Sequence, residues 1–258
     1  PVPDWFHDAK LGIFIHCGPY SIPAFAPHGT SDIGQLMTGK VGFEQVPYAE
    51  WYQNSLRVPG SPTEQYHRKT YGADFTYEQF GPQLDEQVRA WQPDTWADLF
   101  ARAGARYVVL VTKHHDGFLM WNSRHPNPRI PGWQLTRDVA GELTAAVNAR
   151  DMKMGFYYSS LLDWTFTPAP ARSLADVLVN CNPSRAYLDY VERHWRELIE
   201  RYDPAILWSD IGYPPGYKLP RLFADFYNHN PEGVVNDRWM QMPGFLFGRV
   251  GRTVLSQV

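Results

Sequence analysis

Cysteine is scarce in this chain, which has two, Cys17 and Cys181, among its 258 residues. Two cysteines cannot build the disulfide framework of a small secreted domain. No group of cysteines and histidines has the spacing of a zinc site, so we expect no bound metal. We expect both thiols to be free. Cysteine usage therefore leaves the redox compartment, and with it the localisation, undecided.

Long apolar runs and an excess of positive charge are also missing. No segment approaches the roughly 20 apolar residues that span a membrane, so we expect no membrane partner. The chain has 24 basic and 27 acidic residues, which offers no basic patch to a nucleic acid. Pro1–Trp5 lacks the pattern of a signal peptide. No internal repeat or low-complexity linker divides the chain, and we expect residues 1–258 to form one domain.

Aromatic residues, by contrast, are abundant, at 15% of the chain with 10 tryptophans. Aromatic rings pack against the apolar C–H faces of sugars, but they also fill hydrophobic cores. Composition alone favours the second role, in which the aromatic residues fill a hydrophobic core.

Several strand-like segments end directly before polar residues. These segments are Gly12–Ile15 before His16, Tyr107–Thr112 before Lys113–Asp116, Met154–Tyr158 before Ser159, Ala205–Trp208 before Ser209–Asp210, and Val234–Val235 before Asn236–Arg238. Parallel barrels carry their active sites at the carboxyl ends of their strands. Packing alone does not explain so many polar strand ends, so this pattern predicts an active site there.

Helical patterns alternate with these strands, which favours βαβ units and a parallel sheet. The expected helices run from about Thr95 to Ala103, Asp138 to Ala149, Ser184 to Arg201 and Leu222 to Tyr227. The long stretch from Cys17 to Pro93 is rich in Pro, Gly, Tyr and His. Such a stretch is usually functional or carries elements of its own.

The strands number about five, with Thr253–Ser256 as the possible start of a sixth. A closed TIM-barrel fold, (β/α)8, needs eight strands. We therefore expect an α/β protein with an incomplete or open TIM-barrel-like sheet of 5–6 parallel strands. An uncovered edge strand promotes aggregation, so we expect a homo-oligomer that hides the open edge.

Asp210 is the strongest single candidate for chemistry, because it follows an apolar strand and stands beside Trp208. A carboxylate there could attack an anomeric carbon, as the nucleophile of a retaining glycosidase does with a second carboxyl about 5 Å away. It could equally be a helix N-cap, a common role for Asp. Its position alone does not separate these two interpretations.

The pair His114–His115 also stands at a strand end, followed by Asp116. Two neutral imidazoles offer both donors and acceptors to sugar hydroxyls. Metal binding would need a third ligand that the sequence does not show. Asp116–Gly117 also has the pattern of a tight turn.

Three further sites have two interpretations each. His16 is a candidate ligand residue or a buried histidine bonded to a carbonyl. Glu50, beside Trp51 in the long stretch, is a hydroxyl-binding or acid group or a solvated loop residue. Arg238 could hold Asp210 through a bidentate pair, or form a structural salt bridge.

Taken together, these segments resemble the α-L-fucosidases of glycoside hydrolase family 29. Trp5–Gly18 is similar to that family's W-x-x-A-K-F-G-I-F-I-H-W-G opening, and Lys113–Phe118 matches its K-H-H-D-G-F signature without change. The other similar segments are Glu50–Tyr52, Gly155–Ser159, Leu207–Asp210 and Val235–Trp239. The matches keep their order from about residue 5 to residue 239.

The resemblance implies a retaining exo-hydrolase that releases terminal α-L-fucose from fucosylated glycans or small fucosides. It implies Asp210 as the nucleophile, and it implies no metal or organic cofactor. It also implies a fucose pocket lined by His16, Glu50, Trp51, His114, His115, Tyr157, Trp208 and Arg238.

The chain departs from the family pattern in three ways. Cys17 replaces a tryptophan, which we expect to loosen the pocket wall. No Asp or Glu occurs from Met240 to Val258, where many family members carry their acid/base. The family's C-terminal β-sandwich has no counterpart.

These departures leave three accounts. The first is an active fucosidase in which Glu50, or a carboxyl from a neighbouring subunit, serves as the acid. The second is a fucose-binding remnant that has lost hydrolysis. The third is a fragment stable only as an oligomer, with no function of its own.

Overall fold

The structure is a computed structural model that describes residues 2–29, 32–167, 169–179, 184–216 and 218–241. Cys181 and the possible sixth strand at Thr253–Ser256 lie outside the described residues. In the part of the chain that is described, no helix is long and apolar enough to cross a membrane.

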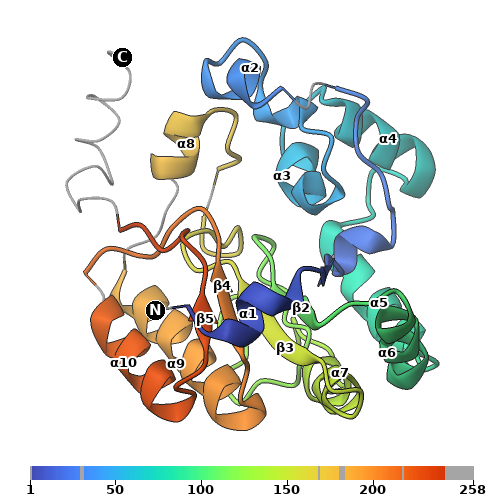
Figure 1. Cartoon of the computed structure of the whole chain (residues 1–258). Coiled ribbons are helices and arrows are strands. Elements are labelled where there is room, and N and C mark those ends of the chain that lie inside the picture. The colour runs from blue at the N-terminus through green and yellow to red at the C-terminus, as the bar shows by residue number, and fades with distance from the viewer. Residues whose placement is uncertain (1, 30–31, 168, 180–183, 217, 242–258) are drawn as a thin grey trace.

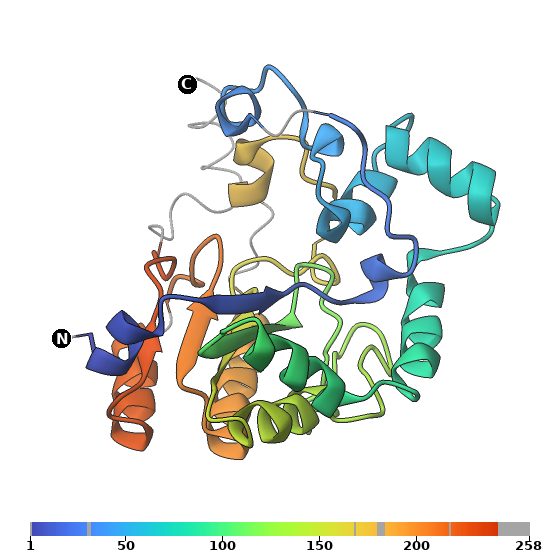
Figure 2. The same ribbon diagram turned by 45° about the vertical axis from the view of Figure 1, so that its right-hand side comes forward.

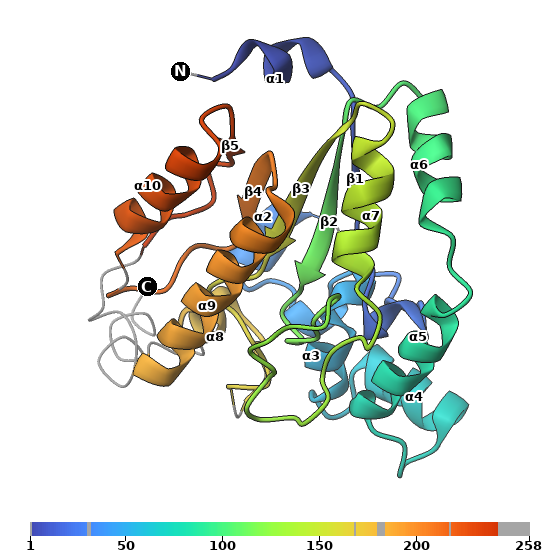
Figure 3. The ribbon, with the colours of Figure 1, turned by 90° about the horizontal axis from the view of Figure 1, so that it is seen from below.

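A parallel sheet forms the centre of the molecule (Figures 1 and 3). Its strands are β1 (Gly12–Ile15), β2 (Tyr107–Lys113), β3 (Lys153–Tyr158), β4 (Ile206–Ser209) and β5 (Val234–Val235). They pair in sequence order, so that β1 and β5 are the two edges of a sheet that does not close. This confirms the expected open, TIM-barrel-like α/β fold, and the strand bounds differ from prediction by at most one residue.

Four helices cover the outer face of the sheet (Figure 3). They are α6 (Pro93–Arg102), α7 (Val139–Asn148), α9 (Arg185–Tyr202) and α10 (Leu219–His229). α7 packs on β2 and β3 and also contacts α6 and α9. α6 begins two residues before the predicted Thr95 because Pro93 occupies its first position, where the missing N–H costs nothing. α10 begins at Leu219, three residues before the predicted Leu222, also with a proline in its first turn.

The long stretch after β1 contains regular structure, as one of the two expectations for it proposed. Its elements are η1 (Pro19–Ser21), α2 (Ile33–Met37), η2 (Phe43–Gln45), η3 (Ala49–Trp51), α3 (Tyr52–Leu56), α4 (Pro62–Tyr71), η4 (Tyr77–Gln79) and α5 (Phe80–Val88). Figures 1 and 2 show α2, α3 and α4 beyond the carboxyl end of the sheet, together with α8 (Leu174–Val179). This layer stands above the strand ends, where the polar residues are.

The amino-terminal end of the sheet is spanned by α1 (Asp4–Ala9), as Figure 3 shows from below. Trp5 Nε1 donates a 2.8 Å hydrogen bond to the carbonyl oxygen of Glu232, just before β5. Trp5 and Phe6 also pack against the buried side chains of the inner face, among them Val109. α1 therefore connects the two edge strands across the bottom of the open barrel.

A buried ion pair fixes the carboxyl end of β2 to the loop after β3. The side chains of Lys113 and Asp163 are both fully buried, and Lys113 Nζ lies 3.2 Å from Asp163 Oδ2. Lys113 Nζ also donates to the carbonyl oxygens of Ser159 at 2.8 Å and Leu162 at 3.3 Å. Burial lowers the pKa of Lys113, and the charge of Asp163 opposes that effect. The buried Lys113 ammonium group therefore holds the loop after β3 in place through these three contacts.

Replacing Lys113 by Met is expected to lower the free energy of unfolding by about 3–5 kcal/mol, because the Asp163 carboxylate is then buried without its partner. Urea unfolding followed by tryptophan fluorescence measures the change. The matched control is the double variant Lys113→Met with Asp163→Asn, which removes the orphaned charge and should recover much of the loss. A single variant as stable as the double one would contradict a charged pair at this position.

The expectations that residues 1–258 form one domain and that copies associate through the sheet edges stay predictions.

Candidate active site

Asp210 follows the last residue of β4 and is held by three donors. Its Oδ2 accepts a hydrogen bond from the Tyr157 hydroxyl at 3.0 Å. Its Oδ1 accepts one from Arg238 Nη1 at 2.9 Å and one from the backbone N–H of Ile211 at 3.0 Å. Arg238 thus forms an ion pair with Asp210 through one nitrogen and one oxygen, and the bidentate pair, one of the two interpretations left open, is not formed. The residue before α10 in the N-cap position is Lys218, so Asp210 does not cap that helix.

The imidazoles of His114 and His115 are buried, and His114 packs against Tyr157, the residue that donates to Asp210. The ring of His114 stacks on that of Tyr157, with centroids 5.5 Å apart and planes 8° apart. Burial lowers the pKa of both histidines well below the usual range, and the neighbouring Lys113 adds to this for His115. Both rings are therefore neutral at physiological pH and keep one donor and one acceptor nitrogen each.

His16 and Glu50 form a charged or hydrogen-bonded pair on the far side of His114 from His115. Nδ1 of His16 lies 2.8 Å from Oε1 of Glu50, and the ring of His16 lies 5.7 Å from that of His114. Burial, the largest single effect, raises the pKa of Glu50. The hydrogen bond from His16, a backbone hydrogen bond and the nearby His114 and His16 rings together outweigh burial, and the net pKa lies below the usual value. Glu50 is therefore ionised at neutral pH.

Trp51 and Trp208 complete the predicted set. Trp51 meets the ring of His115 edge to face at 5.6 Å. Trp208 contacts Phe14 at 5.1 Å, and Phe14 in turn contacts Tyr157. A continuous row of contacts therefore joins all of the predicted site residues, from the carboxyl ends of β1 to β5.

Trp164 is a residue of this cluster that the sequence did not single out. Its ring lies 5.5 Å from those of both Trp51 and His115. Its backbone N–H donates to the carbonyl oxygen of His115 at 2.7 Å. It comes from the loop after β3, and no motif or strand end marked it.

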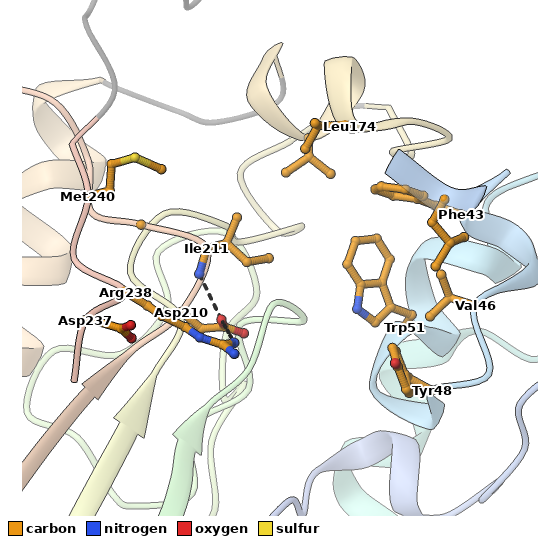
Figure 4. A pocket seen from close by; sticks show the side chains of 13 residues that line it. Phe43, Val46, Tyr48, Trp51, Leu174, Asp210, Ile211, Asp237, Arg238 and Met240 are labelled. Atoms are coloured by element: carbon orange, nitrogen blue, oxygen red, sulfur yellow. Dashed lines mark hydrogen bonds and ion pairs between the residues drawn. The ribbon is translucent and has the colours of Figure 1, made fainter. Parts of the chain in front are cut away.

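A cavity of about 580 Å³ opens beside Asp210 (Figure 4). Of the predicted residues, Trp51, Asp210 and Arg238 line it, and Asp237 adds a second carboxylate. The remaining lining residues, which sequence reasoning missed, are Leu36, Phe43, Val46, Tyr48, Leu174, Val177, Ile211, Gly212 and Met240. Most are ordinary apolar residues on short helices or in loops, so the sequence carried no signal that they share a cavity.

Cys17 does not form part of this cavity wall. It packs against the main hydrophobic core and lines a separate apolar cavity of about 190 Å³ with Leu84 and Trp91. Burial raises the pKa of its thiol. The expectation that Cys17 loosens the sugar pocket was therefore wrong, because successive residues along an extended segment face opposite sides and Cys17 points away from the side that His16 faces.

Among the described residues, no group of three or more His, Cys, Asp or Glu side chains could hold a metal ion.

Asp116 lies beneath the histidine pair and is fully buried. It accepts hydrogen bonds from the Tyr77 hydroxyl at 2.8 Å and the backbone N–H of Phe118 at 3.1 Å. Gly117, with φ of 75°, donates to the carbonyl oxygen of His114, so the tight turn expected at Asp116–Gly117 is present. Burial raises the pKa of Asp116 to about 6, against the opposing effect of Tyr77.

Comparison with known proteins identifies relatives of one kind. A family model described as alpha-L-fucosidase matches residues 1–247. The alpha-L-fucosidase of Dictyostelium discoideum is 34% identical over 255 residues, which cover 93% of this chain and 49% of that protein. The human tissue alpha-L-fucosidase is 35% identical over 253 residues, which cover 93% of this chain and 47% of that protein.

A solved structure gives the same result. The crystal structure of the Thermotoga maritima alpha-fucosidase is 43% identical with a TM-score of 0.81, over 92% of this chain and 53% of that one. A second structure of the Thermotoga maritima enzyme, in complex with fucose, has a TM-score of 0.82. The chain spans about half the length of the curated relatives it matches.

Replacing Asp116 by Asn is expected to flatten the dependence of stability on pH between about pH 4 and pH 6. The pKa of Asp116 is higher in the folded state than in an unfolded chain, about 6 against about 3.9. The folded state therefore holds the proton more tightly, and this contribution to stability is lost as the pH rises through 6. The difference corresponds to about 3 kcal/mol.

Urea unfolding gives the free energy of unfolding of wild type and variant at pH 4 and pH 7. Subtracting the variant's change between the two pH values from that of the wild type removes the contribution of the other carboxylates. The variant should gain relative to wild type at pH 7. Identical pH dependence in the two proteins would contradict the raised pKa.

Proposed function

The chain belongs to the α-L-fucosidase family, and from this we propose that it hydrolyses terminal α-L-fucosides with retention of configuration. Its substrates are fucosylated glycans or small fucosides. Asp210 is the nucleophile. The observation that carries the proposal is the Asp210 carboxylate, held by Tyr157 and Arg238 at the carboxyl end of β4 and facing the cavity.

The geometry of Asp210 supports nucleophilic attack. The three donors hold both carboxylate oxygens in place, so the group does not need to reorient when substrate binds. In the first step an Asp210 oxygen bonds to the anomeric carbon while the bond from that carbon to the aglycone oxygen breaks. In the second step water attacks the same carbon and releases Asp210, and two inversions give net retention.

The neutral histidines support the binding of a sugar. His114 and His115 are neutral, which suits hydroxyl groups better than it suits an anion. Nδ1 of His115 is already hydrogen-bonded to the Ser159 hydroxyl at 2.6 Å, so His115 offers the sugar its other ring nitrogen. Tyr157, whose pKa burial raises far above its usual value, stays protonated and donates to Asp210. Trp51 supplies an aromatic face at the cavity wall.

The general acid is a separate question. A proton donor needs a raised pKa, whereas the pKa of Glu50 lies below its usual value because of His16. This charge state weighs against Glu50 as the acid. We propose instead that Glu50 positions His16 and accepts hydrogen bonds from substrate hydroxyls. Asp237 is the second carboxylate at the cavity within the part of the chain that the structure describes.

Asp210→Ala is expected to reduce the turnover of 4-nitrophenyl α-L-fucoside at least about 10³-fold, because removal of a nucleophile abolishes the covalent route. Turnover is followed by release of nitrophenolate. Added azide should restore part of the rate in the variant and yield the β-configured fucosyl azide, since a small anion fits the space that the carboxylate leaves.

Asp237→Ala is the matched control, because it removes the neighbouring carboxylate of the same cavity and should cost far less with this activated leaving group. The reverse order of the two variants would reassign the nucleophile to Asp237. Absence of turnover in the wild type would contradict hydrolysis and leave the fucose-binding remnant or the fragment with no function of its own.

Glu50→Gln is expected to slow the hydrolysis of 4-nitrophenyl and alkyl fucosides by similar factors, because its proposed role is to position His16 and the sugar. General acid catalysis contributes about 10²–10⁴-fold, and it matters most for poor leaving groups. The ratio of kcat/KM for the two substrates is therefore the measurement. A variant that loses the alkyl fucoside selectively would restore Glu50 as the acid.

A further inference from the structure

The cavity beside Asp210 extends well beyond the predicted fucose-binding residues. Its volume of about 580 Å³ lies within the range of sites that hold a whole drug-sized molecule. Most of the predicted sugar-binding residues, among them His114 and Tyr157, are not part of its lining. The cavity therefore has room for something attached to the sugar as well as for the sugar.

The two sides of this cavity differ in chemistry. Its charged lining residues are Asp210, Asp237 and Arg238, and Figure 4 shows all three on one side. The opposite side and the top are formed by Phe43, Val46, Trp51 and Leu174 (Figure 4). We call these four residues the apolar wall.

The apolar wall is backed by a packed hydrophobic cluster. Phe43 and Val46 are 7% and 4% exposed and belong to a cluster with Leu161 and Leu162, against which Trp51 and Leu174 pack. Phe43 and Trp51 meet edge to face at 5.4 Å. Their positions are therefore fixed by packing, which makes the wall a preformed surface.

The direction of the reaction assigns this surface to the leaving group. In a displacement the nucleophile attacks from the face opposite the bond that breaks, so the aglycone points away from Asp210. Figure 4 shows the apolar wall across the cavity from Asp210. We propose that the apolar wall is an aglycone site that binds an alkyl or aryl group attached to the anomeric oxygen of fucose. This inference rests on the proposed function and specifies its substrate class.

On this side of the cavity the polar side-chain groups of the described lining are the Trp51 indole N–H and the Tyr48 hydroxyl. Most hydroxyl groups of a sugar aglycone would find no side-chain partner there, and each unpaired buried polar group weakens binding. An alkyl chain would instead bury its methylenes there. Each buried methylene is worth roughly a fourfold gain in affinity. The site therefore favours apolar fucosides over fucose linked to another sugar.

The test compares methyl and hexyl 1-thio-α-L-fucoside, which resist hydrolysis, by calorimetry with the wild-type protein. The two ligands differ only in the chain that is to reach the apolar wall. We expect the hexyl compound to bind at least about tenfold more tightly. Leu174→Gln should remove most of that gain and leave the affinity for the methyl compound unchanged.

A second variant and a control guard against loss of the fold. Leu174 is half-buried, so Leu174→Ala shortens the apolar wall without placing a polar group against its hydrophobic cluster, and it should also weaken hexyl binding. Leu99, on α6, is 54% exposed and outside the cavity lining. Leu99→Gln makes the same chemical change elsewhere and should leave both affinities as in the wild type.

The outcomes separate this inference from the function on which it rests. Equal affinity for the two thiofucosides would overturn the aglycone site while fucose recognition stands. A hexyl gain that survives in both Leu174→Gln and Leu174→Ala would also overturn it. Failure of both thiofucosides to bind would overturn the proposed function and this inference with it.

Discussion

The parallel direction of all five strands is the constraint on which the site depends. Because each strand is followed by a return to the opposite end of the sheet, every carboxyl end lies at the same rim. His16, His114 and Asp210 are separated by long stretches of chain, yet each directly follows or ends a strand and all meet at that rim. The long stretch after β1 then brings Glu50 and Trp51 over this rim. The Lys113–Asp163 ion pair holds the loop after β3, which contacts Trp51, in place.

The sequence was sufficient for the strands and for their polar ends. The apolar runs at Tyr107–Thr112 and Met154–Tyr158 are bounded by charged or small residues, and the structure extends each of them by one residue. The helix predicted from Asp138 is also present, with Asp138 as its cap, accepting from the N–H of Gly141 at 3.1 Å. Local patterns suffice where the fold uses one repeating unit.

Other parts of the site depend on packing that no local pattern reports. Trp164 and three residues of the apolar wall, Phe43, Val46 and Leu174, come from segments without a strand end or a motif. They lie near Trp51 only because the long stretch after β1 folds back over the loop after β3. The lowered pKa of Glu50 likewise could not be inferred from its neighbours in the chain. It depends on the 2.8 Å contact with His16, which is distant in sequence. The direction in which Cys17 faces, by contrast, follows from continuing the alternation of β1 by two residues. Because the sequence predicted the bounds of β1 correctly, this direction was predictable.

The bridge formed by α1 has a consequence for the order in which the chain folds. Each strand pairs with the next in sequence, so the sheet can grow by one βα unit at a time through contacts of modest separation along the chain. The hydrogen bond from Trp5 to Glu232 joins positions 227 residues apart. Closing so long a loop is slow, and it gains nothing until both ends are structured. The docking of the Trp5 indole on Glu232 therefore requires both edges of the sheet to be in place, and we expect it to follow the pairing of the strands.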